Sequence, residues 1–345
     1  MVTDQLKDGY DVVVVGGGAA GLSGALMLAR ARRSVAVVDA GAPRNAPAGG
    51  VHGLLGLDGT PPGELLDRGR AEVRRYGGHV VSGEVGDVSR EPGRDGTGFE
   101  VALTDGRTVR ARRLLVTTGL VDGLPDVPGL RERWGRDVVH CPYCHGWEVR
   151  DRAIGVLATG PMSVHQALLF RQWSDDVTFF AHTMPSPAGD EAEQLAARGI
   201  PVVEGEVASV ETADDRLVGL RLGDGTVVGR EALAVATRMT ARGGFLSALG
   251  LRPREHPSGM GEHIPADATG ATDVPGVWVA GNVTDLSAQV GASAAAGAAA
   301  AAQINADLIA EETREAVAAH RALAAAGRDG RGFEAPDAVL RARRR

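Results

Sequence analysis

The chain has 345 residues, of which 43% are hydrophobic and 23% charged, so we expect a soluble globular protein with about two domains. A formal net charge of −7 argues against a general nucleic-acid role, because phosphate binding needs a clustered basic surface, and the basic "LRARRR" at residues 340–345 is interpreted as a solvated tail. The sequence shows no signal peptide and no apolar run of membrane-spanning length, so we expect a cytoplasmic protein without membrane contact.

Residues 10–40 predict a strand, a helix and a second strand. The β-branched run "YDVVVV" is typical of a strand buried on both faces, and "GGGAAG", the helical "LSGALMLARAR" and the apolar "SVAVVDA" follow it. In this spacing Gly16 supplies a tight turn, Gly18 lets the backbone approach a pyrophosphate, and Gly21 lets the helix pack on the strand. Asp39 lies where a carboxylate accepts from ribose hydroxyls. We prefer this dinucleotide-binding turn to a purely structural one, and expect its contacts from Gly16, Gly18, Ala19, Ala20, Gly21 and Asp39.

Residues 61–115 predict a helix and then strands. The stretch "PPGELLDRGRAEVRRYGG" is amphipathic with helical spacing, whereas "HVVSGEVGDVS" and "FEVALTDGRTVRARRLLVTTG" alternate apolar and polar residues around the hairpin turn "TDGR". Gly and Pro then interrupt "TTGLVDGLPDVPG", which contains Thr118 and Gly119. This stretch is interpreted as a crossing between domains.

Residues 152–183 repeat the first unit in weaker form, with "AIGVLATG" as strand and turn, "PMSVHQALLFRQW" as helix and "DVTFFAHT" as second strand. Such a duplication indicates two related nucleotide-binding domains. Later, "VPGVWVAGNVTD" precedes a predicted helix over 287–310, whose small residues favour close packing on a cofactor-binding sheet over a membrane span. Beyond Glu311 we expect a helical extension and a loose tail.

The chain resembles the low-molecular-weight thioredoxin reductases over about residues 9–310. Four features together carry this resemblance: the glycine turn with Asp39, the "TTG" before the crossing, the CxxC of Cys141 and Cys144, and "GVWVAGNV" before the last helix. The resemblance implies an α/β fold with two Rossmann-like domains, FAD as cofactor and a homodimer. Its implied layout is an FAD domain split into residues 1–117 and 244–310, a central NADPH-like domain of residues 118–243 that carries the redox disulfide, and a tail of residues 311–345.

The second FAD segment contributes the cofactor contacts Gly281, Asn282, Gln289 and Val290 in this resemblance. The family places an acidic side chain against the flavin ribityl chain where this chain has Asn282, which can still hydrogen-bond a hydroxyl. Arg44 and His52 follow the first nucleotide-binding unit, so they either border the flavin or substrate or are simple loop residues.

The predicted central domain departs from the family pattern in two ways. The family's GxGxxA turn is replaced by residues 158–163, "ATGPMS", where the Cβ of Ala158 crowds the approach of a pyrophosphate. The family's arginine pair for the NADPH 2′-phosphate is replaced by His182, Thr183 and Met184, with no arginine before Arg198. We predict that this domain has lost its nicotinamide site; the alternative is a divergent but working NADPH site.

A third departure is His145, which follows Cys144 where thioredoxin reductases usually have aspartic acid. The "CPYCHG" pattern is similar to the flavin-dependent dithiol oxidases that close disulfides in natural products such as gliotoxin and holomycin. That resemblance implies electron flow from a small dithiol to the enzyme disulfide, to FAD and then to O2, which becomes H2O2. It assigns exchange with the substrate to Cys141 and electron transfer to FAD to Cys144. An imidazole can take the proton of an incoming thiol, so His145 is predicted as base and His140 as a second candidate. The alternative for His140 is a packing or supporting residue, and that interpretation is favoured for His140 taken alone.

Other interpretations stay open. A zinc site formed by both cysteines with His140 and His145 is disfavoured, because ligands so close in sequence cannot easily surround a tetrahedral ion, and we expect no metal. Tyr143 and Trp147 either line an apolar pocket or pack in the core. The rival functions are a thioredoxin reductase driven by NADPH or ferredoxin, with a thioredoxin-like protein as partner, and a redox-sensing flavoprotein without turnover.

Overall fold

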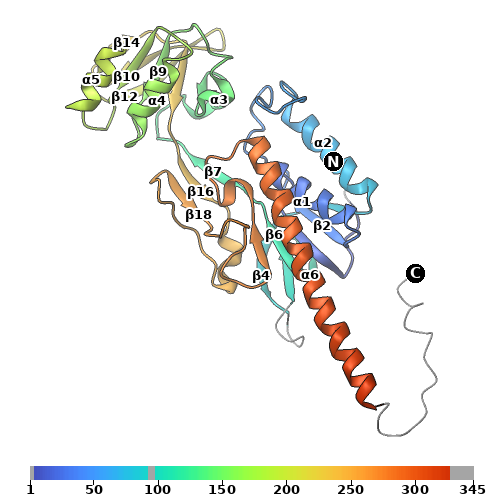
Figure 1. Cartoon of the computed structure of the whole chain (residues 1–345). Coiled ribbons are helices and arrows are strands. Elements are labelled where there is room, and N and C mark those ends of the chain that lie inside the picture. Colours follow the sequence, from blue (N-terminus) through green and yellow to red (C-terminus); the bar gives the residue numbers. More distant parts are fainter. Residues whose placement is uncertain (1–3, 92–97, 327–345) are drawn as a thin grey trace.

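The computed structural model describes residues 4–91 and 98–326, which form two α/β lobes (Figure 1). The first lobe contains a seven-stranded sheet of order β3-β2-β1-β6-β5-β4, with β19 beside β6. Strand β1 is parallel to β2 and β6, and β5 is antiparallel to β4 and β6. The strands are β1 (Gly9–Val15), β2 (Val35–Asp39), β3 (His79–Ser82), β4 (Val85–Arg90), β5 (Phe99–Leu103), β6 (Thr108–Val116) and β19 (Val277–Val279).

Helices α1 (Ala19–Arg30), α2 (Pro62–Arg75) and α6 (Val290–Ala326) belong to this lobe. Small residues allow α1 and α6 to pack closely: a Cβ on Gly297 would lie 1.9 Å from the carbonyl oxygen of Ala20. The predicted close packing of the alanine-rich helix is therefore explained by backbone contact.

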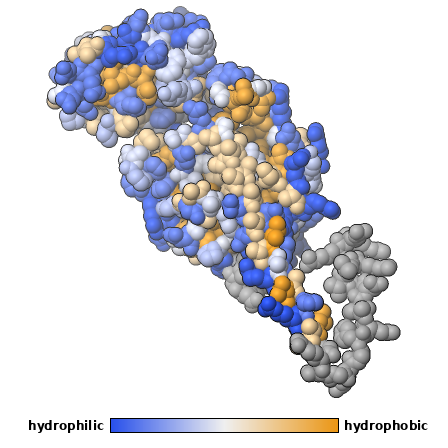
Figure 2. Space-filling model, viewed as in Figure 1, coloured by the Kyte–Doolittle hydropathy of each residue, from blue (hydrophilic) through white to orange (hydrophobic). Residues whose placement is uncertain are grey.

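The C-terminal half of α6 projects beyond the lobe as the predicted helical extension, and the predicted loose tail lies outside the described residues (Figure 1). Apolar residues gather along α6 in Figure 2, and Ile309, Val317 and Leu323 are exposed there. Despite its 37 residues, α6 does not qualify as a membrane span, and neither does any other helix within 4–91 and 98–326.

The second lobe contains a five-stranded parallel sheet of order β11-β10-β9-β15-β8. A three-stranded antiparallel sheet, β12-β13-β14, belongs to the same lobe. The elements are β8 (Val138–Val139), α3 (Pro142–His145), β9 (Ile154–Leu157), α4 (Ser163–Phe170), β10 (Val177–Phe180), α5 (Asp190–Ala197), β11 (Val202–Val203), β12 (Val207–Ala213), β13 (Arg216–Leu222), β14 (Val227–Val228) and β15 (Ala232–Val235).

Two antiparallel strands, β7 (Leu120–Gly123) and β16 (Arg238–Ala241), carry the chain between the lobes. They form a four-stranded sheet with β17 (Arg254–Glu255) and β18 (Gly261–His263). Short 3-10 helices span Arg131–Arg133, Gly244–Leu249 and Gly281–Val283. The fold class predicted from the resemblance is confirmed by this arrangement and by the solved relatives described below; the predicted domain boundaries stay a prediction.

Candidate active site

A cavity of about 970 Å³ is lined by residues of both lobes. One part is the predicted glycine turn, and another is the CxxC segment. The predicted residues that line it are Cys141, Cys144, His145, His140, Gly16, Gly18, Ala19, Ala20, Asp39, Arg44, His52, Thr118, Gly119, Gly281, Asn282, Gln289 and Val290. Gly21 is the predicted site residue that does not line it.

The glycine turn has the shape of a phosphate cradle. Gly16 has a φ of +105°, and a Cβ there would lie 2.6 Å from the carbonyl oxygen of Thr117. A Cβ on Gly21 would lie 1.9 Å from the carbonyl oxygen of Gly16, so a glycine at position 21 allows α1 to contact the turn directly. Gly18 precedes α1, and a Cβ there would meet nothing within 4 Å. The open face at Gly18 and the N–H groups of the first turn of α1 fit a pyrophosphate.

Asp39 lies at the end of β2 and is 9% exposed. Its Oδ1 accepts the N–H of Gly41 at 3.1 Å, and its Oδ2 accepts from Nη2 of Arg70 at 3.0 Å. Gly17 packs directly on this carboxylate, since a Cβ there would lie 2.6 Å from the carboxyl carbon. Arg70 thus holds Asp39 at the cavity wall, where lone pairs remain for ribose hydroxyls.

Asn282 presents an acceptor to the cavity. Its Nδ2 donates to the carbonyl oxygens of Asp285 and Ala288, each at 2.9 Å. Because these carbonyls only accept, the amide nitrogen must face them, and Oδ1 is left for a hydroxyl donor. The oxygen of Asn282 can therefore accept a hydrogen bond from a ribityl hydroxyl, as the acidic residue does in the family that this chain resembles. Its nitrogen also fixes the loop before α6.

We expect Asn282→Asp to lower the free energy of unfolding by about 2 kcal/mol, because both carbonyls lose their donor and face a carboxylate. Urea unfolding of the FAD-loaded protein, followed by circular dichroism, measures this change. Asn305→Asp is the matched control, since Asn305 uses its Oδ1 to accept from Nε of Arg33 at 2.7 Å, and a carboxylate there should not destabilise the protein. Equal losses in both variants would contradict the assigned orientation of Asn282.

Cys141 and Cys144 form a disulfide across the start of α3, with their Cα atoms 5.2 Å apart. Pro142 begins this short helix, and Gly146 follows it. Gly146 packs on the indole of Trp173, where a Cβ would lie 2.7 Å from a ring carbon. The close contact with Trp173 fixes the disulfide segment against the second lobe.

The two predicted bases are held differently. The imidazole Nδ1 of His140 lies 3.1 Å from the carbonyl oxygen of Val235, whereas both ring nitrogens of His145 are buried and have no partner within the described residues. Burial lowers the pKa of His140, and the Arg44 guanidinium lowers it further. Burial also lowers the pKa of His145, although the Glu148 carboxylate opposes that shift. Both imidazoles are therefore neutral at neutral pH and able to accept a proton.

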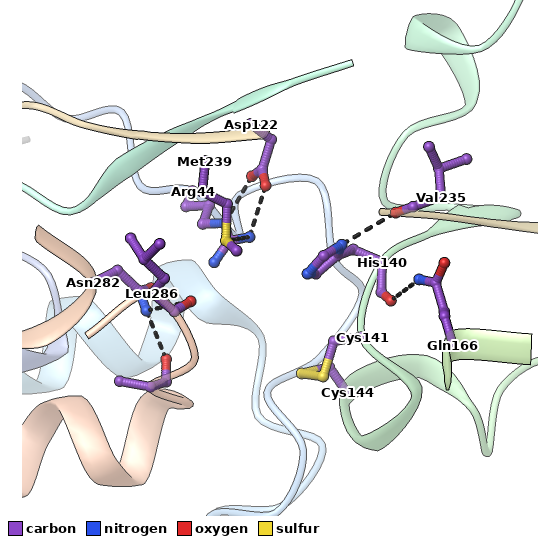
Figure 3. The surroundings of a disulfide bond; sticks show 11 residues. Arg44, Asp122, His140, Cys141, Cys144, Gln166, Val235, Met239, Asn282 and Leu286 are labelled. Atoms are coloured by element: carbon purple, nitrogen blue, oxygen red, sulfur yellow. Dashed lines mark hydrogen bonds and ion pairs between the residues drawn. A yellow bond between two sulfur atoms is a disulfide. The ribbon is translucent and has the colours of Figure 1, made fainter. Parts of the chain in front are cut away.

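Arg44 joins the first lobe to the crossing strands. Its Nε and Nη2 donate to the two carboxylate oxygens of Asp122, each at 2.7 Å (Figure 3). Thr237 donates to Asp122 Oδ1 at 2.6 Å. Despite its burial, the pKa of Asp122 is lowered by these bonds and by the Arg44 charge. This bidentate pair ties the loop that carries Arg44 to β7, and a contact of Arg44 with the flavin or the substrate stays a prediction.

His52 also links the lobes. Its Nδ1 lies 3.6 Å from Oδ1 of Asp58 in the first lobe. Its Nε2 lies 3.4 Å from Oε1 of Glu148, which follows helix α3 in the second lobe. Tyr143 lines the cavity but is 63% exposed, and Trp147 is 65% exposed, so neither packs in the core.

The corresponding turn of the second lobe is already capped by the protein. Ser163 Oγ accepts the N–H groups of Thr159 at 3.0 Å and Gly160 at 3.3 Å. Ser163 is 2% exposed, so its hydroxyl lies where a phosphate oxygen would have to bind these amides. After β10, His182 turns its Nδ1 toward the N–H of Val207 at 3.0 Å and offers no cation for a phosphate.

Sequence reasoning missed Asp122, Thr237 and Ser163. Asp122 and Thr237 are separated from Arg44 by 78 and 193 positions, and no local pattern marks them. Ser163 begins α4, but its hydroxyl bonds back to the turn at Thr159 and Gly160, so the helix-capping pattern does not predict this role. Among residues 4–91 and 98–326, no group of His, Cys, Asp and Glu could hold a metal ion.

Comparisons with known proteins agree with this geometry. The family model for pyridine nucleotide-disulphide oxidoreductases matches residues 10–319. Thioredoxin reductase tcpT from Claviceps purpurea is 34% identical over 248 residues, which are 70% of this chain and 77% of that protein. The crystal structure of HlmI is 48% identical with a TM-score of 0.86, over 93% of this chain and 100% of that chain. An oxidoreductase from Agrobacterium tumefaciens is 36% identical with a TM-score of 0.81, over 87% of this chain and 98% of that chain.

Proposed function

The chain belongs to the pyridine nucleotide-disulphide oxidoreductase family, and from this premise we propose that it oxidises a small-molecule dithiol to a disulfide and reduces O2 to H2O2. Like its thioredoxin reductase-like relatives, it is an FAD-dependent oxidoreductase that acts on thiol and disulfide groups. The observation that carries the proposed direction is the contrast between the two glycine turns: the first is open to the cavity at Gly18, and the second is capped by Ser163.

This contrast supports electron entry from a thiol. A nicotinamide cofactor needs its pyrophosphate on the second turn and, for NADPH, a cation for its 2′-phosphate. The hydroxyl of Ser163 occupies the amides of the second turn that a pyrophosphate would need. At the place of the 2′-phosphate the chain has His182, whose pKa is lowered by burial, instead of an arginine. The disulfide in contrast lines the same cavity as the phosphate cradle. The similarity of "CPYCHG" to natural-product dithiol oxidases points to the same direction.

The residues have defined roles in this reaction. One substrate thiol, having lost its proton, attacks Cys141, and the Cys141–Cys144 bond breaks so that Cys144 leaves as a thiolate. The second substrate thiol then attacks the mixed disulfide, the substrate leaves as an intramolecular disulfide, and Cys141 leaves as a thiol. Bound FAD would supply the two-electron acceptor for Cys144, so that Cys141 and Cys144 could re-form their disulfide and the two electrons could reach O2. The sum converts one dithiol and one O2 into one disulfide and one H2O2.

The test is oxygen consumption by the FAD-loaded protein with dithiothreitol, a small dithiol. We expect continuous uptake of O2 with one H2O2 formed for each O2 consumed. No turnover with any dithiol would contradict the oxidase and favour a sensor without turnover.

The second candidate is a thioredoxin reductase, which the names of tcpT and the Leptosphaeria maculans protein sirT favour. The exposed Tyr143 and Trp147 beside the disulfide would suit a protein partner. Reduction of thioredoxin at the expense of NADPH or ferredoxin, faster than dithiol oxidation, would establish that function instead. The homodimer stays a prediction, which sedimentation velocity measures.

A further inference from the structure

His140 is fixed from two sides at the carboxyl end of the parallel strand β8. Its Nδ1 lies 3.1 Å from the carbonyl oxygen of Val235, at the end of the neighbouring strand β15, and Gln166 Nε2 donates to the His140 carbonyl at 2.8 Å (Figure 3). Val235 and Gln166 therefore set the position of the ring and of its backbone. Figure 3 shows the free edge of the ring and the disulfide on the same side, toward Arg44 and Asn282.

The contact with Val235 also decides the tautomer. A backbone carbonyl only accepts hydrogen bonds, so Nδ1 of neutral His140 must carry the hydrogen and Nε2 must carry the lone pair. His140 lines the cavity, and its Nε2 is not among the buried unpartnered atoms of the described residues. The basic nitrogen thus faces accessible space beside Cys141.

His145 has the opposite arrangement. Both of its ring nitrogens are buried and neither makes a hydrogen bond of normal geometry within the described residues, although the Cys141 backbone acts on the ring in the direction that raises its pKa. A thiol in the cavity could reach these nitrogens only after the ring turned. An oriented base with an accessible lone pair is the arrangement that activates a nucleophile in enzymes.

We propose that His140, through Nε2, is the general base that takes the proton of the attacking substrate thiol, and that His145 does not serve this step. The assignment rests on the proposed function. As the substrate S–H bond breaks, its proton moves to His140 Nε2, the substrate sulfur bonds to Cys141 Sγ, and the Cys141–Cys144 bond breaks with its electron pair going to Cys144. When the second substrate thiol closes the product, Cys141 leaves with the proton held at Nε2, and the proton of the second thiol passes to the freed Nε2.

The charges around His140 keep it in the required form. Arg44 and burial lower its pKa, whereas the Val235 hydrogen bond and the Asp122 carboxylate act in the other direction, and His145 is the other titratable ring nearby. A pKa below the ordinary value of about 6.5 means that the neutral base is present at neutral pH and is lost only as the pH falls below that value.

The experiment follows the exchange step alone. The FAD-loaded wild type, His140→Gln and His145→Gln are mixed anaerobically with limiting dithiothreitol between about pH 6 and pH 9. Alkylation with iodoacetamide and mass spectrometry count the opened Cys141–Cys144 disulfide, and flavin absorbance is read in parallel. Neither oxygen nor the natural substrate is needed.

A base makes exchange nearly independent of pH between its own pKa and that of the thiol, so wild type and His145→Gln should vary less than about threefold from pH 6.5 to pH 8. Only preformed thiolate reacts in His140→Gln, so its rate should be about a hundredfold lower at pH 6.5, rise about tenfold per pH unit and approach wild type near pH 9.

The opposite pattern, with the steep profile in His145→Gln, would overturn the assignment while leaving the dithiol oxidase intact. A steep wild-type profile would also overturn it, even if His140→Gln does not fold, because it would mean that no base acts. A wild-type disulfide that dithiothreitol does not open at any pH would instead contradict the proposed function itself.

Discussion

Cys144→Ser is expected to reduce oxygen consumption with dithiothreitol by about a thousandfold or more while FAD stays bound. A serine hydroxyl cannot form the disulfide that a substrate thiol opens, and it cannot pass electrons to FAD. The cavity loses only one sulfur atom, and the glycine cradle at Gly16 and Gly18 is unchanged. Flavin absorbance after gel filtration measures cofactor content, and an oxygen electrode measures turnover.

Cys141→Ser is the matched variant, because it removes the other half of the same disulfide. Turnover should be lost equally, since neither variant can hold the oxidised pair. A Cys144→Ser protein that still consumed oxygen at more than about a tenth of the wild-type rate would show that dithiols reach FAD without the disulfide, and the electron path would be wrong.

Gly18→Val is expected to weaken FAD binding by about a hundredfold or more. No atom lies within 4 Å of a Cβ at Gly18, and its φ of −79° suits a β-branched residue, so the variant should fold. The added methyl groups project where the pyrophosphate must approach the N–H groups of α1, and charge-assisted bonds worth about 3 kcal/mol are lost. Equilibrium titration of FAD into the protein after cofactor removal measures the change.

Gly160→Val places the same change at the corresponding turn of the second lobe, where a Cβ also meets nothing within 4 Å. Because Ser163 already caps the amides of this turn, the variant should keep its FAD affinity and its dithiol turnover. Unimpaired FAD binding in Gly18→Val would refute the cradle, and loss of an NADPH-dependent activity in Gly160→Val would refute the closed nicotinamide turn.

Much of this site could be predicted from the sequence because its signals are local. The glycine spacing, the position of Asp39 at the end of a strand and the CxxC segment each lie within a few residues of the turn or helix that places them. Even Gly21, which does not line the cavity, has its predicted role, because it allows α1 to contact the turn at Gly16.

The parts that could not be predicted depend on contacts between residues far apart in the chain. His140 gains its orientation from Val235, 95 positions away, and Arg44 meets Asp122 78 positions away. The sequence also favoured His145 as the base because it follows Cys144, whereas burial of both its ring nitrogens can be read only from packing. Side-chain environment, rather than spacing along the chain, separates the two histidines.

Anaerobic stopped-flow mixing tests most directly whether electrons enter from a dithiol through Cys141 and Cys144. One sample of FAD-loaded protein receives dithiothreitol and another receives NADPH at the same concentration. The proposed electron path predicts rapid bleaching of the flavin absorbance by the dithiol, an unchanged spectrum with NADPH, and recovery of the absorbance with one H2O2 per flavin when oxygen is admitted. Rapid bleaching by NADPH, with little or none by the dithiol, would contradict it.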